Sequence, residues 1–243
     1  RARMVKSTGS VNSKQQDLRW LSVVSTCLIV VLGVSCQWRD KARRAETPPS
    51  LATPSSSSLV PLSADVSPQL KHLVESALEQ TKITKGYDPS YIAINYPGGD
   101  VPLETGVCSD VIVRGFRKAG IDLQKEIHED MKLAWSSYPR KWGLSNPDTN
   151  IDHRRVLNLM TYFDRKGKAV PITAIRGDYL PGDIVAWDLG NRVDHIGIVV
   201  NVWSADSHGY LIVHNIGTGA RCQDVLLNWR IIGHYRYFQA GAH

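Results

Sequence analysis

The chain has 243 residues, of which 42% are hydrophobic, and this is enough to build a folded core without disulfide or metal cross-links. Its formal net charge is +6, but residues 1–65 hold nine Lys or Arg and four acidic residues, so this segment accounts for +5. The remainder carries +1, which argues against a nucleic-acid-binding protein. The four cysteines form no CxxC pair, so a structural zinc site of that type is not expected.

The N-terminal 36 residues have the pattern of an export signal. Basic residues precede an uncharged apolar run over residues 20–36 that ends in small residues. The run is also about long enough for a short membrane anchor. Residues 32–36 resemble the end of a bacterial lipoprotein signal, with Cys36 as the lipidated residue. We therefore expect export to the periplasm or cell envelope, with membrane contact only through this segment.

The next segment, residues 37–66, is rich in proline and serine and is expected to be a disordered linker. A folded domain is expected over residues 67–240. It opens at Ser67-Pro68, a pair typical of a helix start, which precedes apolar residues at helical spacing from Leu70 to Leu78.

The central motif of the sequence surrounds Cys108. Apolar residues at helical spacing follow it, and Gly120 stands where a helix would stop. Cys108 is therefore predicted at the N-terminus of a buried helix, where the helix dipole and free N–H groups favour a nucleophilic thiolate. The alternatives are that Cys108 is a small buried hydrophobic residue, or that it pairs with Cys222.

The remaining pattern predicts an α+β fold. A helix is expected over residues 123–136, a long loop over 138–150, and a further helix over residues 153–163 with Asp152 as its cap. Apolar segments separated by short turns then predict antiparallel strands. These lie at residues 184–187, 193–203, 210–215 and 231–238.

A cysteine nucleophile needs a base, and the base needs a third group to hold it. His195 begins an apolar strand, with Gly197 leaving open space on the same face. His214 and Asn215 end the next strand, and because strand side chains alternate only one of them can face His195. We prefer His214 as the third residue and keep Asn215 as the alternative. Each histidine has a simpler interpretation as a structural residue.

The order and spacing of these motifs resemble the papain-like cell-wall cysteine peptidases of the NlpC type. The resemblance rests on Cys108 at a helix start, on residues 181–185 (Pro-Gly-Asp-Ile-Val) and on residues 195–199 (His-Ile-Gly-Ile-Val). More narrowly, residues 127–131, 150–156 and 214–217 resemble the YijF-like family of bacterial envelope proteins, domain-of-unknown-function family 1287.

The resemblance implies a papain-like NlpC-type fold, with Cys108 as nucleophile, His195 as base and His214 as the third polar residue. It also implies an exported amidase or endopeptidase acting on peptidoglycan stem peptides or similar amides. Tyr96 resembles the tyrosine that precedes the nucleophile in that superfamily. One departure is that Val107 and Asp110 replace the Asp and Gly that commonly flank the cysteine there. No cofactor is implied, and a monomer is expected.

A second polar cluster follows the nucleophile motif, and its arginines are suited to grip substrate carboxylates. We assign substrate contacts to Tyr96, Asp110, Asp130, Asp152, Arg154 and Arg155. The simpler alternative is that these are surface or capping residues in salt bridges. A metal-dependent hydrolase is a rival reading, because four residues are of ligand type: His128, Asp130, Asp152 and His153. The other rival is a non-catalytic envelope module that binds a wall peptide or a partner.

Overall fold

The structure is a computed structural model, and it describes residues 56–238. The expected export signal, Cys36 and most of the expected linker lie outside the described residues. Within the described part, no helix is both long and apolar enough to cross a membrane.

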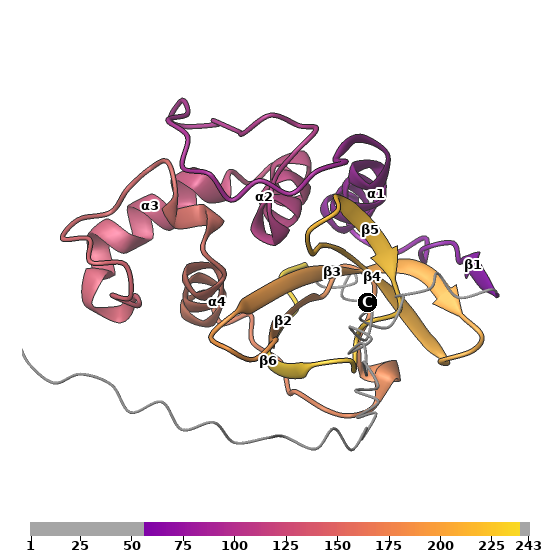
Figure 1. Ribbon diagram of the computed structural model, residues 1–243. Coiled ribbons are helices and arrows are strands. Elements are labelled where there is room, and N and C mark those ends of the chain that lie inside the picture. Colours follow the sequence, from indigo (N-terminus) through magenta and orange to yellow (C-terminus); the bar gives the residue numbers. More distant parts are fainter. Residues whose placement is uncertain (1–55, 239–243) are drawn as a thin grey trace, which may run out of the picture. The chain divides into compact units, whose positions relative to one another are not determined.

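Helices come first along the chain and strands follow, except for one short strand at the start (Figure 1). The helices are α1 (Pro68–Ile83), α2 (Cys108–Lys118), α3 (Leu123–Ala134), η1 (Trp135–Ser137), η2 (Asp152–Arg154), α4 (Val156–Arg165) and η3 (Arg176–Asp178). The strands are β1 (Ser57–Leu59), β2 (Ile184–Asp188), β3 (Asp194–Ser204), β4 (Gly209–Asn215), β5 (Ala220–Gln223) and β6 (Arg230–Tyr235). The expected α+β class is confirmed.

The strands form one antiparallel sheet in the order β5-β4-β3-β2-β6, and β1 pairs with the far end of β3. The expectation of a disordered linker up to residue 66 is wrong at its end, because Ser57–Leu59 is this strand. Strand β3 has 11 residues and β2 only five, so β3 extends past its neighbour and leaves backbone groups unpaired. Backbone pairing does not require apolar side chains, so a serine-rich segment can fill the place.

Alternating side chains divide the sheet into two apolar faces. One face packs against the helices, with Leu73 of α1, Ile112 of α2 and Ile198 of β3 fully buried in the same cluster. Helices α1, α2 and α4 gather on this side of the strands (Figure 1). The other face carries Trp187 and Val199 and is covered by the loop after β5. The sheet is therefore buried on both sides in its centre.

Helix α2 is the central helix, and its local sequence explains its position. A Cβ atom at Gly115 would lie 2.8 Å from a side-chain carbon of Leu73 and 3.2 Å from one of Ile198, so the glycine permits α2 to fit between α1 and β3. The helix begins at Cys108, and the predicted stop is confirmed at Gly120, which has φ of 88°. The N-terminus of α2 is thus fixed against the sheet.

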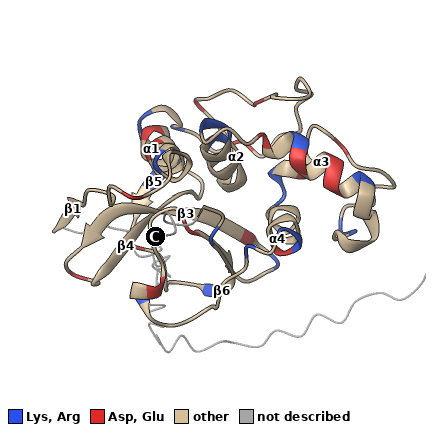
Figure 2. Ribbon diagram, turned by 180° about the vertical axis from the view of Figure 1, so that it is seen from behind, with Lys and Arg blue, Asp and Glu red and all other residues tan. Residues whose placement is uncertain are grey.

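The helices beyond α2 differ in detail from their predictions. Asp122 caps α3 by accepting a hydrogen bond from the Gln124 backbone N–H. Asp152 does not cap one continuous helix. It begins the short helix η2, and α4 starts only at Val156. Acidic and basic residues are interspersed along α1 and α3, whereas the strands carry few charges (Figure 2).

Candidate active site

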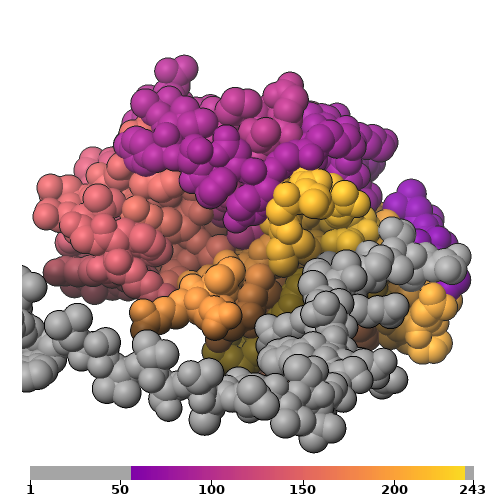
Figure 3. Space-filling model, in the orientation of Figure 1, coloured from indigo at the N-terminus to yellow at the C-terminus, as the bar shows by residue number. Residues whose placement is uncertain are grey.

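The predicted nucleophile, Cys108, is the first residue of α2 and is 6% exposed. It lies in the wall of a cleft of about 230 Å³. The other lining residues come from the segment between α1 and α2, from the loop before η2, from η2 itself, and from the starts of α4 and β3. They are Tyr87, Pro89, Val107, Trp142, Ile151, Arg154, Arg155, Val156, Leu157 and Asp194. In Figure 3, the segment between α1 and α2 covers the upper face of the molecule.

Burial decides the protonation state of the Cys108 thiol. It raises the pKa of this thiol to about 12, and the nearby Asp110 carboxylate acts in the same direction. Hydrogen bonds from the backbone N–H groups of Ile196, Ser109 and Cys108 itself lower the pKa, but by less. The expectation of a thiolate favoured by the helix N-terminus is therefore wrong for the resting state, in which the thiol is protonated. Cys108 and Cys222 are both free thiols rather than a disulfide.

His195 and His214 form a hydrogen-bonded pair on adjacent strands. The Nε2 atom of His195 lies 2.8 Å from Nδ1 of His214, and Nε2 of His214 lies 3.0 Å from Oε1 of Gln223. Both rings are buried, and the Trp229 ring packs edge-on against each of them. Burial lowers the pKa of His195 to about 3 and that of His214 to about 4, so both rings are neutral at pH 7.

The thiol and the histidine pair meet at one peptide group. Ile196, whose N–H donates to the sulfur of Cys108, directly follows His195 in β3. Among the described residues, the His195 ring makes its hydrogen bond to His214 and none to Cys108. Since Nε2 of His195 is occupied, Nδ1 is the nitrogen that can accept a proton from a nucleophile.

Asn215 is not the partner of His195. Its side-chain amide donates to the backbone carbonyl oxygens of Gly86, at 3.1 Å, and Gly106, at 2.9 Å. These glycines stand next to Tyr87 and two residues before Cys108. Asn215 therefore holds together the two ends of the segment between α1 and α2, which forms one side of the cleft.

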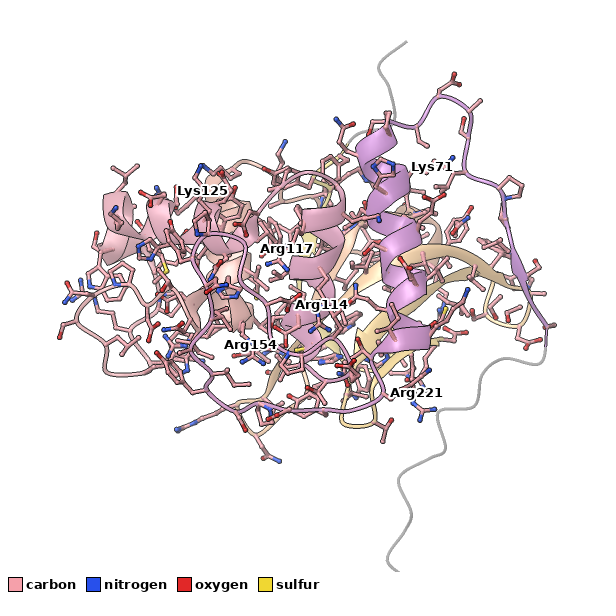
Figure 4. All side chains as sticks on the ribbon, turned by 90° about the horizontal axis from the view of Figure 1, so that it is seen from above. Lys71, Arg114, Arg117, Lys125, Arg154 and Arg221 are labelled. Atoms are coloured by element: carbon pink, nitrogen blue, oxygen red, sulfur yellow. The ribbon has the colours of Figure 1, made fainter. Side chains whose placement is uncertain are left out.

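Arg154 and Asp110 form a buried ion pair and are not free to bind a substrate. The guanidinium makes two hydrogen bonds to the carboxylate, at 2.9 and 3.0 Å, and also donates to the carbonyl oxygens of Asp88 and Ser90. Asp110 in addition accepts from the Val107 backbone N–H at 2.6 Å and so caps α2. Arg154 lies beside that end of α2 (Figure 4). The substrate role expected for this pair is replaced by a structural one, although Arg154 still forms part of the cleft wall.

Arg155 is the arginine best placed for a ligand. It lies on the cleft wall, its guanidinium is 4.2 Å from the centre of the Trp142 ring, and it contacts the Asp152 carboxylate at 2.9 Å. Asp152 is itself buried and also accepts from the Asp148 backbone N–H. Asp152 therefore orients Arg155 and does not line the cleft.

Tyr96 and Asp130, both expected to contact substrate, do not line the cleft. The Tyr96 hydroxyl donates to Glu129 on α3 at 2.8 Å. Asp130 accepts from Tyr138 at 2.8 Å and from Arg165 at 2.6 Å, so its carboxylate is satisfied within the fold.

The metal-dependent alternative finds no support in the described residues. Over residues 56–238 no three His, Cys, Asp or Glu side chains are grouped so that they could hold a metal ion. Two of the four ligand-type residues are already engaged, since Asp130 pairs with Arg165 and Asp152 with Arg155.

Several residues around the site carry no signal in the sequence. Tyr87 lies on the cleft wall near Cys108; burial raises its pKa, and the neighbouring Asp110 carboxylate acts in the same direction. It thus stands where Tyr96 was expected. Trp142 and Asp194 also line the cleft. Nothing in the spacing of these loop residues signals their meeting, although Asp194 could have been found as the neighbour of the candidate base.

Comparison with solved structures gives matches at low sequence identity. A crystal structure described as similar to a lipoprotein of the NLP/P60 family, from Staphylococcus aureus subsp. aureus Mu50, shares 15% identity. The match covers 76% of this chain and 45% of that one, with a TM-score of 0.33. An N-acetylmuramoyl-L-alanine amidase from Bacteroides uniformis ATCC 8492 shares 14% identity over 71% of this chain and 100% of that chain, with a TM-score of 0.44.

Sequence relatives give a firmer result. A protein of Escherichia coli K12 named uncharacterized protein YijF is 51% identical over 166 residues, which are 68% of this chain and 80% of that protein. The family described as domain of unknown function DUF1287 matches residues 74–237, the part that contains the cleft, the histidine pair and the sheet. The chain therefore belongs to the DUF1287 family.

Proposed function

We propose that the protein is a cysteine hydrolase of the cell envelope that cleaves amide bonds, with peptidoglycan stem peptides as its substrate class. The observation that carries the proposal is a cleft-lining cysteine at a helix N-terminus, next to the adjacent strands β3 and β4 that carry a buried histidine pair. A nucleophile, a base and a group that holds the base are the parts that acyl transfer to sulfur requires. The substrate class rests on the resemblance of the motifs to NlpC-type peptidases.

The resting state fixes the order of the proton steps. Because the Cys108 thiol is protonated and His195 is neutral, the proton must move to Nδ1 of His195 as the sulfur attacks the amide carbonyl. Backbone N–H groups at the start of α2 stabilise the negative oxygen of the tetrahedral intermediate. The intermediate collapses to a thioester, and the leaving amine takes the proton from His195.

Release of the acyl group repeats these steps with water. Water gives a proton to Nδ1 of His195 and attacks the thioester carbonyl. The carbon–sulfur bond then breaks, and the Cys108 sulfur regains the proton from His195. The product acid gives its remaining proton to solvent and leaves as a carboxylate. Arg155 at the cleft wall is suited to hold a carboxylate of the substrate, since its guanidinium donates in a planar fork.

The test is digestion of purified peptidoglycan and soluble muropeptides, with the products identified by mass spectrometry. Wild type should produce new amine and carboxyl ends, and Cys108→Ala should produce none. Cys222→Ala is the matched control, because Cys222 is the other free cysteine among residues 56–238 and lies outside the cleft lining. Equal cleavage by wild type and Cys108→Ala would refute the cysteine mechanism.

One observation favours a second candidate, a non-catalytic module that binds wall peptides. Cys108 and His195 share no hydrogen bond among the described residues, and the thiol is protonated. In that case wild type and Cys108→Ala should retain the same wall fragments in a pull-down experiment and release no new ends. The same digestion therefore separates the two candidates.

The proposed setting follows from the segment that precedes the described residues. The basic and apolar pattern of residues 1–36 supports export, with Cys36 as a candidate lipidation site. Residues 67–240 would then form the hydrolase domain outside the cytoplasmic membrane. Mass analysis of the mature N-terminus from cells distinguishes a cleaved signal from a diacylated Cys36.

A further inference from the structure

The buried hydrogen-bond chain does not end at the second histidine. Gln223, the last residue of β5, is 7% exposed, and its Oε1 atom lies 3.0 Å from Nε2 of His214. Strand β5 pairs with β4, so the side chain is carried by the sheet itself rather than by a loop. The chain of contacts therefore runs from Gln223 through His214 to His195.

The order of donors and acceptors along this chain is determined at its Gln223 end. A carboxamide oxygen only accepts, so Nε2 of His214 must carry the proton. A neutral imidazole has one N–H, which leaves Nδ1 of His214 as an acceptor. Nε2 of His195 must then donate to it. By the same rule, Nδ1 of His195 is left with a lone pair.

The buried, apolar surroundings of the two histidines make the order of donors and acceptors important for the base. Each imidazole on its own can place its proton on either nitrogen, and only one of the two tautomers of His195 is a base at Nδ1. Both rings are enclosed by apolar and aromatic groups, with Trp229 packed against both and Trp187 tilted over His195. A wrong tautomer would leave buried donors facing each other, which is costly where water is excluded.

We propose that Gln223 is a positioning residue that holds His214 and His195 in their Nε2–H tautomers and so keeps Nδ1 of His195 available as the base. The inference rests on the proposed function for its catalytic meaning, but the tautomers exist with or without substrate. Gln223 does not line the cleft, so its effect on the base passes through the histidine pair.

The test combines a spectroscopic and a kinetic measurement. Long-range proton–nitrogen NMR spectra of protein with ¹⁵N-labelled histidine, at pH 7, report which ring nitrogen carries the proton. Wild type should show both rings as Nε2–H. Gln223→Leu removes the acceptor and should shift the tautomer ratio of His214 by about five-fold, the equivalent of the ~1 kcal/mol of one neutral hydrogen bond.

Gln223→Glu keeps an acceptor at the same place, so Nε2 of His214 should stay protonated, and the rate of cleavage should fall less than in Gln223→Leu. Arg221→Ala, at an exposed position of the same strand, is the control and should change neither. A merely structural role would lower the melting temperature of Gln223→Leu without moving the tautomers.

Two results would overturn the assignment. One is a wild-type spectrum with the His195 proton on Nδ1, and the other is a Gln223→Leu spectrum identical to wild type. If the spectra are as expected but no substrate is cleaved, the proposed function fails while the positioning role of Gln223 stands.

Discussion

The protonated state of Cys108 predicts an unusual alkylation profile. With the pKa raised from 9.0 to about 12, the thiolate fraction at pH 7 is about a thousand-fold smaller than for an ordinary cysteine. A more basic thiolate is also more nucleophilic, by about 15- to 30-fold over three pKa units at a Brønsted slope of 0.4–0.5. The net expectation is alkylation at pH 7 that is about 30- to 60-fold slower than for a free cysteine, before any effect of access.

The assay is labelling with iodoacetamide from pH 6 to 11, followed by intact-protein mass. Cys222 also has a raised pKa because of burial, so the profile is measured in Cys222→Ser, with Cys108→Ser as the complementary control. The labelling rate should still be rising at pH 11. An inflection below pH 8, or labelling at pH 7 as fast as a free cysteine, would refute the reasoning and indicate a preformed thiolate–imidazolium pair.

Three further predictions concern stability and substrate contacts. Asp110→Ala leaves the Arg154 charge buried without its partner and should lower the free energy of unfolding by about 3–5 kcal/mol. In a domain of this size the melting temperature then falls by about 6–20 °C. A loss of unfolding free energy below about 1 kcal/mol in a calorimetric scan would contradict the buried ion pair. Tyr87→Ala should lower kcat/KM about ten-fold, whereas Tyr96→Phe should leave it unchanged. If Tyr96→Phe lowers kcat/KM and Tyr87→Ala does not, Tyr96 is the tyrosine that contacts the substrate. The hydrogen-bonded histidines have pKa values lowered to about 3 and 4, so the unfolded state binds more protons below pH 6.5, and denaturant titrations should show stability falling between pH 6.5 and 4.

The sequence was informative wherever local periodicity determines structure. Apolar spacing located α2 and placed Cys108 at or next to its N-terminus, and the structure shows it to be the first residue. The same reasoning located the main strands. The choice between His214 and Asn215 could not be made in this way, because it depends on the cross-strand register between β3 and β4. That register includes an irregularity between Val199 and Trp203, which no single-strand pattern reveals.

Long-range electrostatics and loop positions were beyond local patterns. Asp110 and Arg154 are 44 residues apart, and nothing in either motif indicates that they neutralise each other. The loops that carry Tyr87 and Tyr96 have no periodicity, so the sequence did not say which tyrosine faces the cysteine. The state of the thiol depends on how completely the fold buries it, and burial outweighs the helix N-terminus at Cys108.

The central claim is that Cys108 forms an acyl-enzyme, and partition of that intermediate tests it most directly. Peptidoglycan fragments are digested with added hydroxylamine, which competes with water for a thioester. The account predicts that wild type releases hydroxamate ends along with carboxylate ends, and that Cys108→Ala releases neither. Cleavage that yields only carboxylate ends and persists in Cys108→Ala would contradict an acyl-enzyme on Cys108.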